Sequence, residues 1–140
     1  MASAGDRLRL VAAHLDQADR RLRAARHLLA SGDHEDAVSR AYHAAFHAMT
    51  AALASRDLES KTHAGARRLF ALHFISSGLA PLDVGRAIEA LQRDRQSSDY
   101  DPTPLLSRED AESAVASAER VIAAIRELLG MARGSGDFVG

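Results

Sequence analysis

The feature that most constrains the fold is a run of apolar residues near the start of the chain, spaced alternately three and four positions apart. The run extends over three heptads, at Leu8, Val11, Leu15, Ala18, Leu22, Ala25 and Leu29. Side chains at these spacings share one face of an α-helix, whereas a strand would need an apolar residue at every second position. The pattern predicts a long first helix that buries one face against other elements.

Helical spacing continues through the rest of the chain. Further helices are predicted over residues 35–54, over residues 64–76, from Pro81 through Leu91 to a polar cluster at residues 93–100, and from Ser107 to a stop at Gly130. Because Gly32 suits a tight reversal after the first helix, the first two helices should form an antiparallel hairpin, with the alanine-rich second helix in the centre. No segment alternates with period two, so the predicted fold class is all-α, an up-and-down bundle of about five helices.

Composition limits the classes of function. The 140 residues suffice for one domain, which we place at residues 1–130, with 131–140 as a flexible C-terminal tail. A net charge of −1 argues against a protein that coats nucleic acid, and the absence of cysteine excludes disulfides and thiolate metal sites. No apolar run is long enough for a membrane span, so we expect a cytoplasmic protein without membrane association.

The first candidate site is the polar cluster between Arg93 and Asp101. Its sequence is Arg93-Asp-Arg-Gln-Ser-Ser-Asp99-Tyr100-Asp101, expected where a helix runs into a polar turn. Guanidinium groups bind phosphate bidentately, and a carboxylate or a phenol can transfer a proton. We therefore take Arg95, Asp99 and Tyr100 as candidate catalytic residues, with Arg93 as a phosphate-binding residue.

A second set of polar residues lies on the predicted second helix. Arg40, His43 and His47 share one helical face. Two histidines four residues apart can chelate a metal, but no third ligand is evident, and ordinary partly buried histidines are the simpler interpretation. In the alternative, Arg40 and His43 face Arg95 and act as phosphate-binding and proton-transfer groups. No cofactor is expected.

Two further basic segments have both a functional and a structural interpretation. Lys61 and His63 precede a predicted helix, where backbone N–H groups can bind an anion, or they simply start the helix. The arginines of the first helix are interpreted as an ion-paired surface, because Asp16 and Asp19 lie within pairing distance. These arginines are Arg20, Arg21, Arg23 and Arg26.

The order of these segments resembles the HEPN superfamily, in its branch of small stand-alone proteins often encoded beside a nucleotidyltransferase. The resemblance spans about residues 6 to 129 and rests on the long first helix and on three motifs: Ala37-Val-Ser-Arg-Ala-Tyr-His-Ala-Ala-Phe-His47, Lys61-Thr-His63 with Phe74-Ile-Ser-Ser-Gly78, and Arg95-Gln-Ser-Ser-Asp-Tyr100. It implies a helical bundle that forms a homodimer and joins two copies of the polar motif in one cleft.

The resemblance also implies a function. Active members resemble metal-independent endoribonucleases that use an Arg and a His four to six residues apart, and many are toxins of toxin-antitoxin pairs. The chain departs from this pattern, since the residue five along from Arg95 is Tyr100, and that from Arg93 is Ser98. His43, His47 or His63 would then supply the imidazole. In some toxin members a tyrosine two places beyond the motif histidine is nucleotidylated by the partner enzyme, and counting from Arg93 places Tyr100 there.

Three functions follow from these observations. The first is a toxin-antitoxin-type protein acting on RNA, as a metal-independent endoribonuclease with an altered motif. The second is a non-catalytic dimer that binds a nucleotide or serves as accessory partner of a nucleotidyltransferase. The third, a purely structural helical dimer, explains the apolar pattern but leaves the polar cluster without a role.

Overall fold

The computed structural model describes residues 3–100, 102–103 and 106–130, and of residues 98–100 the backbone alone. The predicted tail, residues 131–140, lies outside this range. The helices are α1 (Ala4–Ala30), α2 (His34–Ser55), α3 (His63–Phe70), α4 (Leu82–Tyr100) and α5 (Arg108–Leu128), and a π-helical segment, η1 (Ala71–Ile75), continues α3. No strand occurs among the described residues, which confirms the predicted all-α class.

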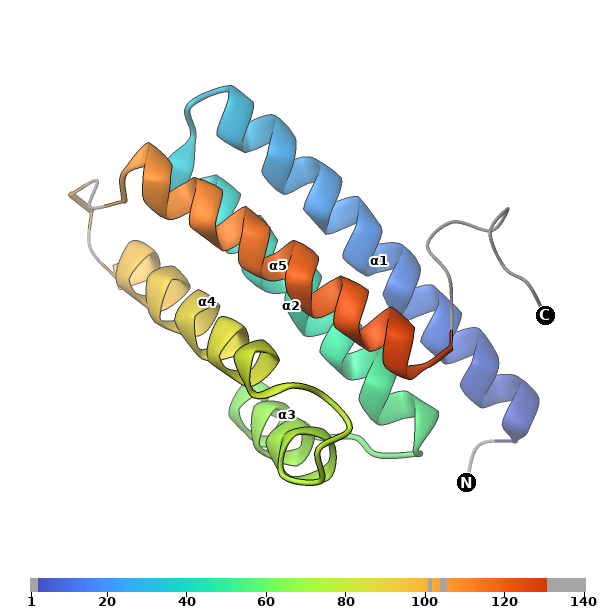
Figure 1. Cartoon of the computed structure of the whole chain (residues 1–140). Helices are drawn as coiled ribbons and strands as arrows, with labels where there is room; N and C mark the ends of the chain where they lie inside the picture. The colour runs from blue at the N-terminus through green and yellow to red at the C-terminus, as the bar shows by residue number, and fades with distance from the viewer. Residues whose placement is uncertain (1–2, 101, 104–105, 131–140) are drawn as a thin grey trace.

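Four long helices lie side by side, and α3 lies across one end of the bundle (Figure 1). The hairpin of α1 and α2 turns at Gly32, whose φ of 84° is in the left-handed region that favours glycine. A capping box starts α5 after Ser107, as the side chain of Ser107 accepts from the Asp110 N–H and the Asp110 carboxylate accepts from the Ser107 N–H. None of the described helices has a stretch both long and apolar enough to cross a bilayer.

The core is built around α2, as predicted. This helix contacts α1, α3, α4 and α5. Its buried side chains are mostly methyl groups, which allow close approach of the neighbouring helices. They include Ala37, Ala41, Ala44, Ala45, Ala48, Ala51 and Ala52. Because α2 is enclosed in this way, any polar side chain on it that reaches solvent must pass between two other helices.

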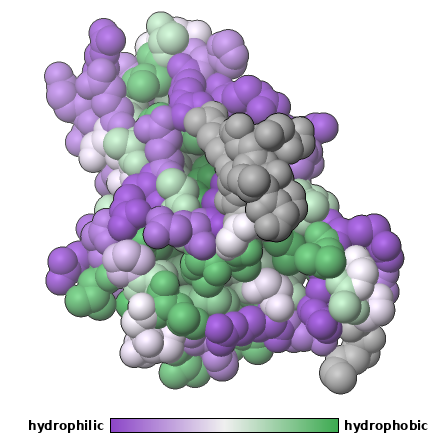
Figure 2. All heavy atoms as spheres, turned by 45° about the vertical axis from the view of Figure 1, so that its right-hand side comes forward, coloured by the Kyte–Doolittle hydropathy of each residue, from purple (hydrophilic) through white to green (hydrophobic). Residues whose placement is uncertain are grey.

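The apolar run of α1 is buried from Val11 to Ala25, partly buried at Leu29 and exposed at Leu8. Val11, Leu15 and Leu22 lie in the core, but Leu8 is 69% exposed. The antiparallel hairpin places Leu8 at about the level where α2 ends, so little covers it. Leu10 is also exposed. On the face shown in Figure 2, hydrophobic side chains gather in a band bordered by hydrophilic ones.

The main difference from the sequence prediction concerns α4. The polar cluster was expected where the helix runs into a turn, and the backbone is helical through the cluster to Tyr100. The segment contains no glycine or proline, and the first proline after it is Pro102. At 3.6 residues per turn, Arg93 and Arg95 therefore project from nearly opposite sides of the helix, and the structure does not bring them together.

Candidate functional site

The centre of the candidate site is Tyr42, a buried phenol on α2. Its side chain is 2% exposed. The guanidinium carbon of Arg95 lies 4.8 Å from the centre of the Tyr42 ring, a cation–π contact between α4 and α2. Arg67 of α3 donates from Nη1 to the Tyr42 hydroxyl at 3.2 Å. One buried ring thus holds cationic side chains from two other helices.

His63 completes this arrangement at the start of α3. Its Nδ1 lies 3.1 Å from the Tyr42 hydroxyl oxygen, and its ring stacks on Phe46 with ring centres 4.0 Å apart. When the Tyr42 O–H donates to Nδ1, the neutral ring carries its proton on Nε2. Burial, Arg95, His43 and Arg67 together lower the pKa of His63. The ring is therefore predominantly neutral near pH 7.

Local structure at the start of α3 fixes the position of His63. Thr62 caps the helix by accepting from the Gly65 N–H at 2.9 Å. A Cβ at Gly65 would lie 2.2 Å from Oγ of Ser60 and 2.8 Å from Oγ1 of Thr62, so a larger residue there would displace the side chain that caps the helix. The sequence segment from Lys61 to Gly65 is thus a helix start, and Lys61 is exposed beside it.

His43 is oriented by its own helix. Its Nδ1 lies 2.8 Å from the backbone carbonyl of Ser39, and because a carbonyl can only accept, Nδ1 carries the proton. In the neutral ring Nε2 is then a proton acceptor. Burial is the main reason that the pKa of His43 is lowered, and the positive charges of Arg95, Arg40 and Arg21 lower it further against the effect of the Ser39 carbonyl.

His47 faces α1. Its Nδ1 lies 3.1 Å from Nδ1 of His14, so one ring donates and the other accepts. The pKa of His47 is lowered to about 4. Burial is the largest cause, followed by the neighbouring groups His14, Arg21 and His43. Among the residues that the structure describes, no group of three or more His, Asp or Glu side chains is placed to bind a metal ion.

The remaining predicted residues divide into two groups. Arg40 is exposed and close enough to lower the pKa of His43. Arg93 is exposed on the other side of α4, where it acts on Asp94, a carboxyl whose pKa is raised mainly by burial and by Asp110. The side chains of Asp99 and Tyr100 lie outside the described part of the structure.

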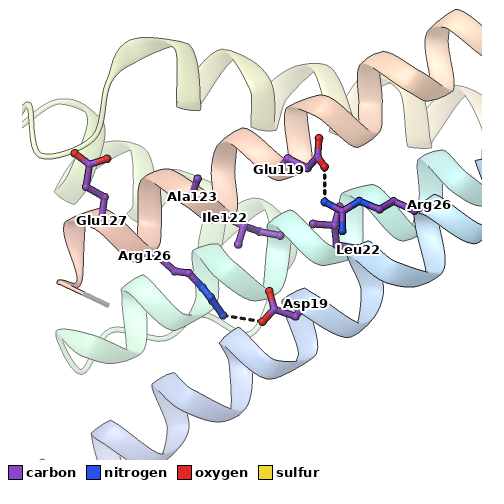
Figure 3. Close-up of a pocket in the computed structure, with 8 residues that line it drawn as sticks. All are labelled: Asp19, Leu22, Arg26, Glu119, Ile122, Ala123, Arg126 and Glu127. Carbon is purple, nitrogen blue, oxygen red and sulfur yellow. Dashed lines mark hydrogen bonds and ion pairs between the residues drawn. The ribbon is translucent and has the colours of Figure 1, made fainter. Parts of the chain in front are cut away.

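A different cavity, between α1 and α5, is closed by ion pairs. It measures about 360 Å³. Figure 3 shows Arg126 of α5 reaching Asp19 of α1, and Arg26 of α1 reaching Glu119 of α5. The Arg126 Nη2 to Asp19 Oδ2 distance is 2.8 Å. Both arginines of the cavity are thus paired with a carboxylate of the other helix, so we interpret this cavity as a helix-to-helix connection.

The arginine band of α1 therefore divides between two roles. Arg20 pairs with Asp16 at 3.0 Å on the surface, as the sequence predicted, whereas Asp19 pairs across to α5. Arg21 lies near His43 and His47 and lowers the pKa of both.

The sequence interpretation missed several members of the candidate site. Arg67, Arg21 and His14 were not among the candidates, and Tyr42 and Phe46 entered only as part of the motif that ends at His47. Their spacing is typical of ordinary helix surface and core, and only the packing of α1, α3 and α4 on α2 brings them together. We call Arg95, Arg67, Tyr42, His43, His63 and Phe46 the basic–aromatic cluster.

The geometry of the cluster suits an anion with an adjacent transferable proton. Arginines supply positive charge, and neutral imidazoles supply a proton acceptor and an N–H donor. Burial, and after it the charges of Arg95 and of the neighbouring arginines, lowers the pKa values of His43 and His63, which keeps these imidazoles neutral beside an anion site. A phosphodiester fits this combination better than an apolar ligand does.

Comparisons with known proteins agree on one family. The HEPN domain model matches residues 11–128. The chain is 34% identical over 119 residues to a protein of Methanocaldococcus jannaschii named "Putative toxin MJ0605", covering 85% of this chain and 88% of that protein. It is 31% identical over 98 residues to "Putative toxin MJ0142" of the same organism, covering 70% and 67% of the two chains.

A solved structure shares the fold. ST0689, described as an archaeal HEPN homologue, superposes with a TM-score of 0.69 at 20% identity, covering 84% of this chain and 95% of that chain. The family model and the shared fold agree. This chain belongs to the HEPN domain family.

Proposed function

We propose that this protein is a toxin-type HEPN protein that acts on RNA as a metal-independent endoribonuclease. The observation that carries the proposal is that Arg95 and His43 both lie against the Tyr42 ring: the Arg95 guanidinium carbon is 4.8 Å and the His43 ring centre 5.5 Å from its centre. The Ser39 carbonyl holds Nδ1 of His43. This imidazole would replace the histidine that the motif lacks. Relatives named as toxins support the biological role.

In the proposed reaction, the ribose 2′-oxygen attacks the adjacent phosphorus. Nε2 of His43 takes the 2′-hydroxyl proton as the new oxygen–phosphorus bond forms. The bond from phosphorus to the 5′-oxygen breaks, and this oxygen takes a proton from water. Arg95, with the N–H of His63, stabilises the negative charge that develops on the phosphoryl oxygens. The products are a 2′,3′-cyclic phosphate and a 5′-hydroxyl.

The test is RNA cleavage in the presence of EDTA. The purified protein and the variants Arg95→Ala and His43→Gln are incubated with labelled single-stranded and structured RNA, and the new 3′ ends are identified. We expect cyclic phosphate ends from the wild type and a loss of about 100-fold or more in either variant, since general acid–base catalysis contributes on this scale. The matched control is Arg93→Ala, which should cleave normally.

The second candidate function is a non-catalytic nucleotide-binding dimer that serves as partner of a nucleotidyltransferase. The absence of a histidine at the motif position favours it. Under this function the same basic–aromatic cluster binds a nucleotide phosphate without cleaving RNA. This second function would be supported if the folded wild-type protein cleaved no RNA but bound a nucleotide in a way that depends on Arg95. In either case we propose a homodimer in the cytoplasm.

A further inference from the structure

A second cavity adjoins the basic–aromatic cluster. It measures about 650 Å³ and lies at the end of the bundle where α1 begins and α2 ends, closed on one side by the segment that leads to α3. Its volume is within the range of small-molecule binding sites, roughly 300–1,000 Å³. Phe46 connects the two regions, because it lines this cavity and stacks on His63 of the cluster.

The walls of the cavity combine apolar and polar groups. Leu10, Leu53 and Leu58 supply apolar surface, and Thr50 lies between Phe46 and Leu53 on the same helix. Unpaired bases bind proteins by stacking on aromatic rings and by hydrogen bonds to their edges. The walls therefore match the two chemical faces of a nucleobase, a flat apolar body and a polar edge.

The charged groups at the rim distinguish among bases. Arg7 and Asp57 form an ion pair of 4.0 Å, whereas Glu59 makes no hydrogen bond or ion pair with any residue that the structure describes. A carboxylate accepts two hydrogen bonds at once, so it favours an edge with adjacent donors. Guanine presents such an edge in its N1–H and 2-amino groups, and uracil has no amino group.

We propose that this cavity is a guanine-selective base pocket for the nucleotide whose phosphate lies at Arg95, with Glu59 accepting from the base edge. The placement of the phosphate rests on the proposed RNA-directed function. Arg95 lies 4.8 Å from the Tyr42 ring centre, and the Tyr42 and Phe46 ring centres are 6.0 Å apart. The Tyr42 and Phe46 rings thus connect the phosphate site at Arg95 to the base pocket.

The experiment is an NMR titration of the full chain with the four ribonucleoside 5′-monophosphates, following the methyl signals of Thr50 and Leu58. We expect GMP to bind at least about tenfold more tightly than UMP, since a good bidentate contact discriminates on this scale. Glu59→Gln should abolish most of the preference. The matched control Glu89→Gln, an exposed glutamate on α4, should retain it.

A second variant tests the pocket without relying on Glu59. Leu10 is 49% exposed, so Leu10→Trp is tolerable for folding and fills the opening of the cavity. This variant should bind all four nucleotides more weakly, as measured by the methyl signals of Thr50 and Leu58. Equal affinity for all four nucleotides, a preference that survives Glu59→Gln, or binding unaffected by Leu10→Trp would each overturn the proposal.

Failure of the base pocket and failure of the proposed function give different results. Cleavage of RNA hexamers in EDTA with no dependence on base identity would keep the ribonuclease and reject the pocket. Guanine-selective binding without cleavage would keep the pocket and reject the ribonuclease in favour of the nucleotide-binding dimer.

Discussion

The imidazole of His43 sets the pH dependence of the proposed reaction. Burial and three arginines lower the pKa of this group below its ordinary 6.5, and the base must be deprotonated to act. Cleavage should therefore rise with pH on the acid side and level off below pH 6.5. The measurement is the initial rate of cleavage across pH 4 to 8 in EDTA. An inflection above pH 7 would assign the base to another group.

The charge of Arg95 should be visible in the titration of its neighbours. Arg95 lowers the pKa values of both His43 and His63, so Arg95→Gln is expected to raise both. NMR titration of the imidazole carbon-bound protons measures the two values directly. Arg93→Gln is the control, because Arg93 acts on Asp94 on the other side of α4. Equal shifts in the two variants would contradict the geometry of the cluster.

Among the helices, the connection between α1 and α5 depends on one buried charge. Arg126 is 9% exposed, and its Nε and Nη1 have no hydrogen-bond partner among the described residues. The carboxylate of Asp19 is therefore the main group that balances its buried charge. Asp19→Ala should lower the free energy of unfolding by about 3 kcal/mol, because it leaves a buried charge unpaired. Asp16→Ala removes an exposed pair with Arg20 and should cost less than about 1 kcal/mol.

Chemical denaturation at neutral pH measures both values. The replacement of both partners, Asp19→Leu with Arg126→Met, should recover most of the loss, because no charge then remains buried. If Asp19→Ala and Asp16→Ala cost the same, the Arg126 pair does not stabilise the contact of α1 with α5.

The pair of His14 and His47 couples the α1–α2 contact to pH. The pKa of His47 is about 4 in the folded protein and near 6.5 in the unfolded chain. Between these values the unfolded state binds the proton first, so stability should fall as pH is lowered from 6.5 to 4. Thermal unfolding of His47→Gln should show a weaker pH dependence in this window. His27→Gln, at an exposed position on α1, should behave as wild type.

Helix positions could be predicted from the sequence, whereas contacts between helices could not. The period of the apolar residues, Gly32, and Ser107 with Asp110 determine where helices begin and end through local interactions. The bond between His14 and His47, and that between Arg126 and Asp19, join residues far apart in the chain. Several rotations and registers of two helices are compatible with one apolar pattern, so these partners required the structure.

For the whole molecule, the candidate site was found in part. Sequence reasoning placed Arg95, Arg40, His43 and His63 among the candidates, and the structure brings them to one surface. It grouped Arg93 with Arg95, whereas the helix that continues to Tyr100 places the two side chains on nearly opposite sides of α4. The role of Tyr42 could not be predicted, since a buried aromatic at helical spacing is typical of a core. Its polar contacts arise only from the packing of α3 and α4.

The last prediction concerns whether one chain contains a whole site. Arg95, His43 and His63 come together around the Tyr42 ring within a single chain, although the expected homodimer would place two copies in one cleft. We therefore expect no cleavage from a heterodimer of Arg95→Ala with His43→Gln, because each chain lacks one of the two groups. Such heterodimers are obtained by co-expression with two different affinity tags and sequential purification, and their assembly is verified by light scattering.

The alternative gives the opposite result. If Arg95 of one chain acted with His43 of its partner, the heterodimer would retain one intact pair, and cleavage would return to about half of the wild-type rate per dimer. The control is the heterodimer of wild type with the double variant Arg95→Ala and His43→Gln, which retains one intact chain. It should cleave when sites lie within chains and be inactive when they are shared. Opposite outcomes of the two heterodimers thus distinguish a site built by one bundle from a site built by two.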